Sequence, residues 1–81
     1  MTNLLILSVG NRKKSALKVQ QILTESGCMV KTRLGIHSNP EGVCSDEGII
    51  ILEVVAGDSD IAGLVVKFEE LDGVKAQLVK I

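Results

Sequence analysis

The stretch NLLILSVG, residues 3–10, is an apolar run that ends in a glycine. Such a run is typical of a strand, and Gly10 breaks it. Residues 12–26 follow with a helical period, and Gly27 stops that helix. Residues 28–36 then alternate apolar with polar side chains, as a half-buried strand does. The first half of the chain is therefore predicted to be strand, helix, strand.

The second half repeats this pattern with the apolar run IIILEVVAG, residues 49–57. Residues 59–71 have a helical period, Gly73 ends it, and residues 74–81 alternate as a strand. The stop glycine follows the start of its apolar run by 23 residues in the first half and by 24 in the second. The chain is therefore predicted to contain two βαβ units of nearly equal length.

Two βαβ units of this length usually interleave as a βαββαβ sandwich. The first and third strands are continuously apolar and belong in the centre of the sheet. The second and fourth carry charged residues, which suit sheet edges; these are Lys31, Arg33, Lys75 and Lys80. We predict an α+β, ferredoxin-like fold: one domain over residues 1–81, with a four-stranded antiparallel sheet in the order 4-1-3-2 and two helices on one face.

Length and composition limit the possible functions. The chain has 81 residues, 46% hydrophobic and 23% charged, which fits a compact domain and excludes disorder. Phe68 is its one aromatic residue, so base-stacking platforms are excluded. The net charge of −1 argues against direct binding to nucleic acid. With no signal peptide or membrane span expected, the chain is assigned to the cytoplasm.

Apolar periodicity predicts the core. In the second helix the stripe is Ile61, Leu64, Val65, Phe68 and Leu71, and in the first it is Ala16, Val19, Ile22 and Leu23. Asp58 or Ser59 is expected to cap the second helix. The strand residues expected to face the helices are Leu5, Leu7, Val9, Ile50, Leu52 and Val54.

The opposite face of the sheet is left without helices, and this open face is predicted to be apolar. Its expected contact residues are Leu4, Ile6, Ile49, Ile51 and Val55. A monomer rarely exposes so large a patch, so we expect a second copy to cover it in a homodimer or homotetramer. The alternative is a strand pair that tolerates exposed aliphatic side chains.

A basic cluster at the start of the first helix is a candidate ligand site. Arg12, Lys13 and Lys14 stand where the helix dipole is already positive, which is locally unfavourable. With Gly10 and Asn11, which can expose backbone N–H groups, they could hold a small anionic metabolite. The alternative is a solvated run of charges.

Metal binding and catalysis have weaker support. His37 and Cys44 could ligate a metal together with carboxylates of the intervening loop, but the spacing matches no common zinc motif, and a polar hairpin loop explains the same composition. Glu53 is expected to pair with Lys31 or Arg33 on the neighbouring strand. No nucleophile, base and orienting group are arranged as a catalytic set, so we expect neither an enzyme nor a cofactor.

The chain resembles the iron-only hydrogenase system regulator family along nearly its whole length. The residues that carry the resemblance are Val19-Gln20-Gln21-Ile22-Leu23 with Gly27, Arg33-Leu34-Gly35-Ile36, Gly48 to Val55, Leu64, Lys67, Leu71 and Gly73-Val74-Lys75. Those proteins are similar to ACT domains and to the ligand-binding domain of the nickel-responsive repressor, all with a βαββαβ fold.

The resemblance implies an ACT-like regulator that binds a small molecule in an oligomer and does not catalyse a reaction. ACT domains seat ligands near the first strand-to-helix loop, which corresponds to Gly10 and Asn11. A several-histidine nickel site cannot be built from His37 alone. Because 81 residues leave no room for a helix-turn-helix beside this fold, transcription regulation would need a separate DNA-binding partner. A structural interaction module without a ligand remains the alternative.

Overall fold

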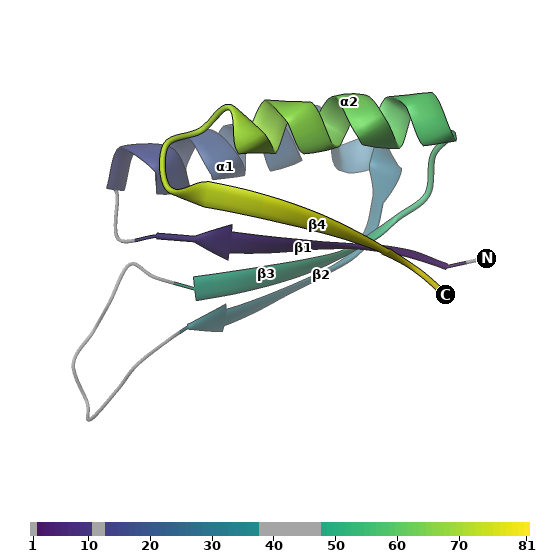
Figure 1. Ribbon diagram of the computed structural model, residues 1–81, viewed down its shortest axis with the longest axis horizontal. Coiled ribbons are helices and arrows are strands. Elements are labelled where there is room, and N and C mark those ends of the chain that lie inside the picture. The colour runs from purple at the N-terminus through teal and green to yellow at the C-terminus, as the bar shows by residue number, and fades with distance from the viewer. Residues whose placement is uncertain (1, 11–12, 38–47) are drawn as a thin grey trace.

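The computed structural model of the chain describes residues 2–10, 13–37 and 48–81, with the side chains of residues 13, 14 and 37 left aside. Its elements are β1 (Asn3–Val9), α1 (Lys13–Glu25), the short 3-10 helix η1 (Gly27–Met29), β2 (Val30–His37), β3 (Gly48–Val54), α2 (Asp58–Glu69) and β4 (Val74–Lys80). The strands form one antiparallel sheet in the order β2-β3-β1-β4, and both helices lie on the same face (Figure 1). The ferredoxin-like sandwich and its strand order are confirmed.

The two apolar strands lie in the centre of the sheet because each can be paired on both sides. β1 is hydrogen-bonded to β3 and to β4 along its whole length, and Leu5 stands opposite both Leu52 and Leu78. The side chains of Leu5 and Leu52 have no exposed surface. Burial of one such side chain stabilises the fold by about 1.5 to 3 kcal/mol.

The helices close the core over this face of the sheet. In α2 the buried stripe is Ile61, Leu64 and Phe68, and in α1 it is Val19 and Leu23, as the periodicity predicts. The predicted cap of α2 is wrong: the N-cap is Gly57, which makes no side-chain hydrogen bond. Asp58 is the first residue of the helix, where its negative charge interacts favourably with the positive end of the helix dipole. Its Oδ1 atom lies 3.5 Å from the Nζ atom of Lys80 on β4.

The second strand begins later than the sequence predicts. η1 occupies Gly27–Met29, and the N–H of Val55 donates to the carbonyl of Met29, so the strand starts at Val30. The register then shifts between Val30 and Thr32, as in a β-bulge. As a result Thr32 stands opposite Glu53 and donates to its Oε1 atom at 3.2 Å. The predicted pairing of Glu53 with Lys31 or Arg33 is therefore wrong.

The turn before β4 is fixed against the end of β1. Gly73 has a φ of 78°, a left-handed conformation that favours glycine. Its carbonyl accepts the N–H of Gly10 at 2.8 Å, and the buried Ser15 hydroxyl donates to the carbonyl of Asp72. A Cβ atom at Gly10 would lie 3.2 Å from the Gly73 oxygen, so a side chain here would require the two segments to move apart by a few tenths of an ångström.

Candidate ligand pocket

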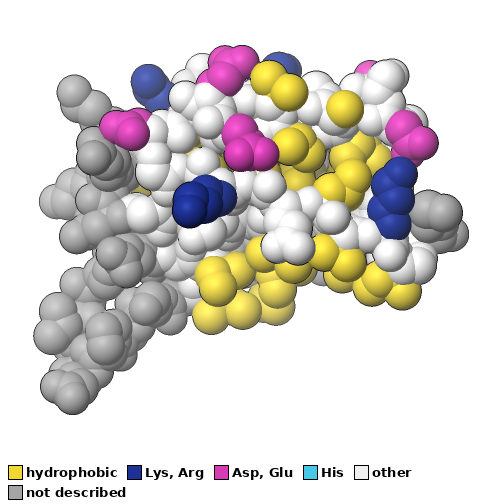
Figure 2. Space-filling view, in the orientation of Figure 1, with side chains coloured by type: hydrophobic (Ala, Val, Ile, Leu, Met, Phe, Trp, Pro, Cys, Tyr) yellow, Lys and Arg dark blue, Asp and Glu magenta, His cyan; other side chains and the backbone are white. Residues whose placement is uncertain are grey.

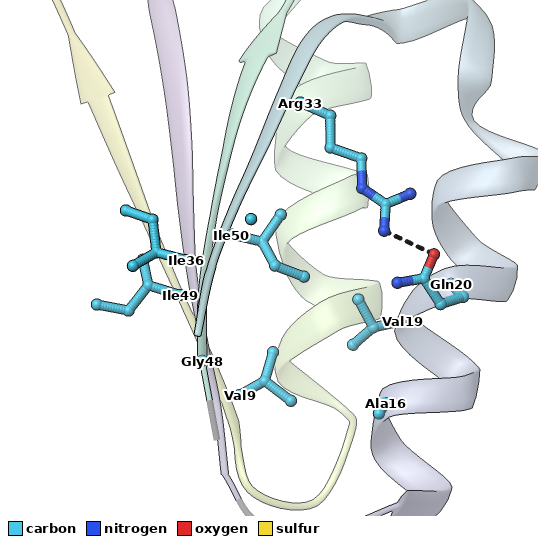
Figure 3. Close-up of a pocket in the computed structure, with 10 residues that line it drawn as sticks. Val9, Ala16, Val19, Gln20, Arg33, Ile36, Gly48, Ile49 and Ile50 are labelled. Carbon is cyan, nitrogen blue, oxygen red and sulfur yellow. Dashed lines mark hydrogen bonds between the residues drawn. The ribbon is translucent and has the colours of Figure 1, made fainter. Parts of the chain in front are cut away.

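A cavity of about 160 Å³ lies between α1 and the strands β2 and β3 (Figure 3). The side chains that face it come from the end of β1, one face of α1 and the middle of β2 and β3: Val9, Ala16, Val19, Gln20, Arg33 and Ile50. Ile36 and Ile49 border the cavity through their backbone, since their side chains point away from α1.

The cavity exists because the position on β2 that should fill it is a glycine. Gly35 stands opposite Ile50 in the sheet register and shares its helix-side face. A Cβ atom built on Gly35 would meet no other atom within 4 Å. The absence of a side chain at this position leaves room for a small molecule.

One polar pair stands at the edge of this apolar space. Nη2 of Arg33 donates to Oε1 of Gln20 at 2.7 Å, which links β2 to α1 and orients the guanidinium. The bulge is what makes this possible, because it places Arg33 opposite Leu52, on the face that the helices cover. Val9 and Val19 are almost fully buried and give the pocket an aliphatic wall. The arrangement suits a molecule with one anionic end and one apolar end.

The structure changes one part of the anion site predicted at residues 10–14, the role of the Gly10 backbone. The N–H of Gly10 is bonded to the Gly73 carbonyl, so it is not available to an anion, contrary to the expectation. Asn11 and Arg12 lie outside the described residues. Lys13 and Lys14 begin α1, and their side chains are not described. The pocket reaches the same end of the first βα unit through Val9 and Ala16.

The predicted metal ligands are not brought together within the described ranges. His37 ends β2 opposite Gly48, and Cys44 lies outside the described residues. Residues 2–10, 13–37 and 48–81 contain no group of three or more His, Cys, Asp or Glu side chains that could hold a metal ion. Cys28 in η1 is exposed. In the same ranges no helix is long and apolar enough to span a bilayer.

The open face has aliphatic residues on all four strands. Leu4, Ile6, Ile49 and Ile51 share it through the register of β1 and β3, and Val55 is exposed just after β3. Three further aliphatic residues, absent from the sequence prediction, extend it across both edge strands: Leu34, Ile36 and Val79. In Figure 2 hydrophobic side chains gather along the side of the molecule away from the helices. We use "open face" below for these eight residues.

The pocket itself was not predicted from the sequence. Arg33 and Gly35 are two residues of the motif Arg33-Leu34-Gly35-Ile36, and their alternation could have indicated that both face α1. Gln20 carried no such signal, because a glutamine on an exposed helix face is unremarkable until a strand partner is known.

The fold has counterparts among solved structures, although no protein-family model and no curated protein matches the chain. The uncharacterized protein TM1266 from Thermotoga maritima aligns with a TM-score of 0.85 at 23% identity, over 96% of this chain and 92% of that one. A formyltetrahydrofolate deformylase from Pseudomonas putida KT2440 aligns at 0.61 and 20% identity, over 100% of this chain and 29% of the deformylase.

CPII from Thiomonas intermedia K12, solved with ADP, AMP and acetate bound, aligns with a TM-score of 0.51 at 14% identity, over 99% of this chain and 89% of CPII. All three identities are below 25%, so these likenesses show the fold alone. That fold is the ACT-like, ferredoxin-like sandwich, and the ACT-like part of the sequence resemblance is confirmed at this level.

Proposed function

We propose that the chain is a non-enzymatic regulatory module that senses a small molecule. The observation that carries the proposal is the pocket between α1 and β2, where Arg33 and Gln20 border an aliphatic cavity of about 160 Å³. Among the described lining residues, Arg33 supplies a positive charge that can bind an anionic group, and the aliphatic residues supply a surface that can bury an apolar group. These lining residues contain no nucleophile paired with a general base. These are the requirements of binding without catalysis.

The fold supports this proposal by analogy. CPII, which shares the sandwich, is a protein solved with nucleotides and acetate bound, so small anions can be held on this architecture. The site in the present chain has its own residues, and its ligand follows from their chemistry. The basic residues Arg12, Lys13 and Lys14 stay part of the proposal as a second source of positive charge near the same end of α1.

The biological setting is proposed from the sequence resemblance. The patterns Arg33-Leu34-Gly35-Ile36 and Gly73-Val74-Lys75 are similar to those of the iron-only hydrogenase system regulators. We therefore propose a cytoplasmic role in regulating hydrogenase maturation, exerted on transcription through a separate DNA-binding partner. Expression of the chain together with hydrogenase maturation genes, and loss of their regulation on its deletion, is the expected result.

Ligand sensing is tested by thermal unfolding against a library of small metabolites and metal ions. A ligand at one hundred times its Kd stabilises the folded state by about 2.7 kcal/mol, which is readily measured in a domain of this size. The Gly35→Leu variant, which fills the pocket, is expected to lose the effect. Lys75→Leu, on the strand at the far edge of the sheet, is expected to retain it. A library without any stabilising member would reject the sensing role.

The open face favours a second candidate function, a homo-oligomerisation or protein interaction module. The side chains of Leu34, Ile36 and Ile49 keep 54%, 47% and 43% of their surface exposed on one continuous patch. A second copy of this face would cover it, as the hydrophobic effect favours. Sedimentation is expected to show a dimer or tetramer in the wild type and a monomer in Ile49→Asp. Val66→Asp, on the exposed side of α2, is the matched control that leaves association unchanged.

A further inference from the structure

Arg33 has donor capacity that the described part of the chain does not use. A guanidinium presents five N–H donors in a planar fork that matches a carboxylate. One Arg33 hydrogen bond, to Gln20, is found among the described residues. The ion pair within those residues joins Lys80 to Asp58, so no described carboxylate neutralises Arg33. The remaining N–H groups can therefore take a carboxylate at the edge of the pocket.

The rest of the pocket is aliphatic and contains no acidic group. Val9, Ala16, Val19 and Ile50 provide its walls, and none of the described lining residues is Asp or Glu. A primary ammonium placed here would lose water without gaining a negatively charged partner, which is unfavourable. The lining is therefore expected to favour an aliphatic acid over the amino acid with the same carbon skeleton.

The volume sets the size of the ligand. An apolar cavity of about 150 Å³ holds a molecule of benzene size, with roughly six heavy atoms. The cavity here is about 160 Å³ and opens toward solvent, so a carboxylate can extend from it to Arg33. A branched chain of four or five carbons fits this space better than a nucleotide or a sugar does.

From these observations we infer that the pocket binds a short, branched aliphatic monocarboxylate that lacks an amino group, such as 3-methylbutanoate or its 2-oxo analogue. The carboxylate binds Arg33, held in place by Gln20, and the branched tail occupies the space that Gly35 leaves free. This inference rests on the proposed ligand-sensing function and adds the chemical class of the ligand.

The experiment is a titration of the ¹⁵N-labelled chain, followed by amide chemical shifts, with 3-methylbutanoate, valine (its 2-amino derivative) and 3-methylbutan-1-amine. A Kd of about 1 mM is expected for 3-methylbutanoate, which for its seven heavy atoms lies well within the limit known for small ligands. Shifts are expected at Gln20, Arg33 and Gly35. Valine is expected to bind at least tenfold more weakly, and the amine is expected to cause no shift at these positions.

Variants separate the pocket from general binding of anions to the surface. Arg33→Leu is expected to weaken 3-methylbutanoate binding about tenfold or more, because a hydrogen bond to a charged group is lost. Lys75→Leu removes a positive charge from the opposite edge strand and is expected to bind like the wild type. Gly35→Leu fills the cavity and is expected to abolish 3-methylbutanoate binding, and Gly35→Val, a smaller residue that is also expected to block the cavity, keeps the test valid if leucine prevents folding.

Each outcome has a distinct meaning. Binding that depends on Arg33 and excludes the amine supports the inference. Equal binding of valine or the amine, or full binding by Arg33→Leu, overturns the ligand class and leaves the sensing function standing. If aliphatic acids do not bind while other members of the library do, the ligand class is likewise overturned and the sensing function stands. If no compound of the metabolite and metal library binds, both the inference and the proposed function are overturned.

Discussion

Replacing Gly35 with valine should stabilise the fold, since the structure leaves space for the new side chain. A Cβ at this position meets nothing within 4 Å, and the backbone does not need a positive φ. Removing a glycine from a strand interior contributes about 0.5 to 1 kcal/mol. Valine adds three carbons at about 0.8 kcal/mol each when buried, and roughly half of this is expected in a half-open cavity. The expected gain is about 2 kcal/mol.

Urea unfolding followed by circular dichroism measures this gain as a higher midpoint at an unchanged slope. In thermal unfolding it corresponds to roughly 8 to 16 °C for a domain of this size. Gly35→Thr is the matched control, because threonine has nearly the same shape and strand preference but carries a hydroxyl, and it should gain about 1 kcal/mol less. A Gly35→Val variant no more stable than the wild type would refute the argument, since the pocket would then not be open to this position.

Three further substitutions, the first with a control variant, test the packing and turns of the fold. Gly73→Ala forces a residue with a side chain into a φ of 78° and is expected to lower the free energy of unfolding in urea by about 1 to 2 kcal/mol. The control Gly63→Ala, at an exposed position of α2, is expected to raise it by up to about 1 kcal/mol. Equal effects of the two variants would contradict the assigned turn. Asn3→Leu removes a buried Oδ1 atom that has no hydrogen-bond partner among the described residues, so chemical denaturation should show a gain of about 1 kcal/mol or more, and a loss would mean that the oxygen is satisfied. Leu64→Ala empties a position that is 2% exposed and is expected to lower the unfolding free energy by about 2 to 5 kcal/mol; a smaller loss would place α2 away from the sheet.

The elements that follow a strong local pattern could be predicted from the sequence. Leu5, Leu7 and Leu52 are fully buried because they lie in the central strands on the face that the helices cover, and the continuous apolar runs already indicate central strands. The same reasoning identifies the stripe of α2 and the apolar open face. These features depend on period and composition, which the sequence contains directly.

The parts that were not predicted depend on contacts between distant segments. The bulge near Lys31 accompanies η1 and the backbone hydrogen bond from Val55 to Met29, and no local pattern in β2 indicates either. A β2 strand without the bulge led to the expectation that Glu53 pairs with Lys31 or Arg33, whereas Arg33 donates to Gln20. The pocket is likewise a consequence of where α1 lies relative to Gly35, a distance that side-chain periodicity does not encode. Sequence reasoning thus found the motif but not its role.

The alternation of β2 makes this strand a partition between two surfaces with different properties. Arg33 and Gly35 belong to the pocket, while Leu34 and Ile36 belong to the open face, and β2 is paired on one side only. A molecule that moves this edge strand on entering the pocket would also displace Leu34 and Ile36 on the open face, because all four residues belong to the same strand. Pairing of β2 with β3 without the bulge, with every residue kept, would exchange the two sets, placing Leu34 on the pocket side and Arg33 on the open face. The proposed sites for a ligand and for a second copy of the chain would thereby be linked through the alternation of one strand.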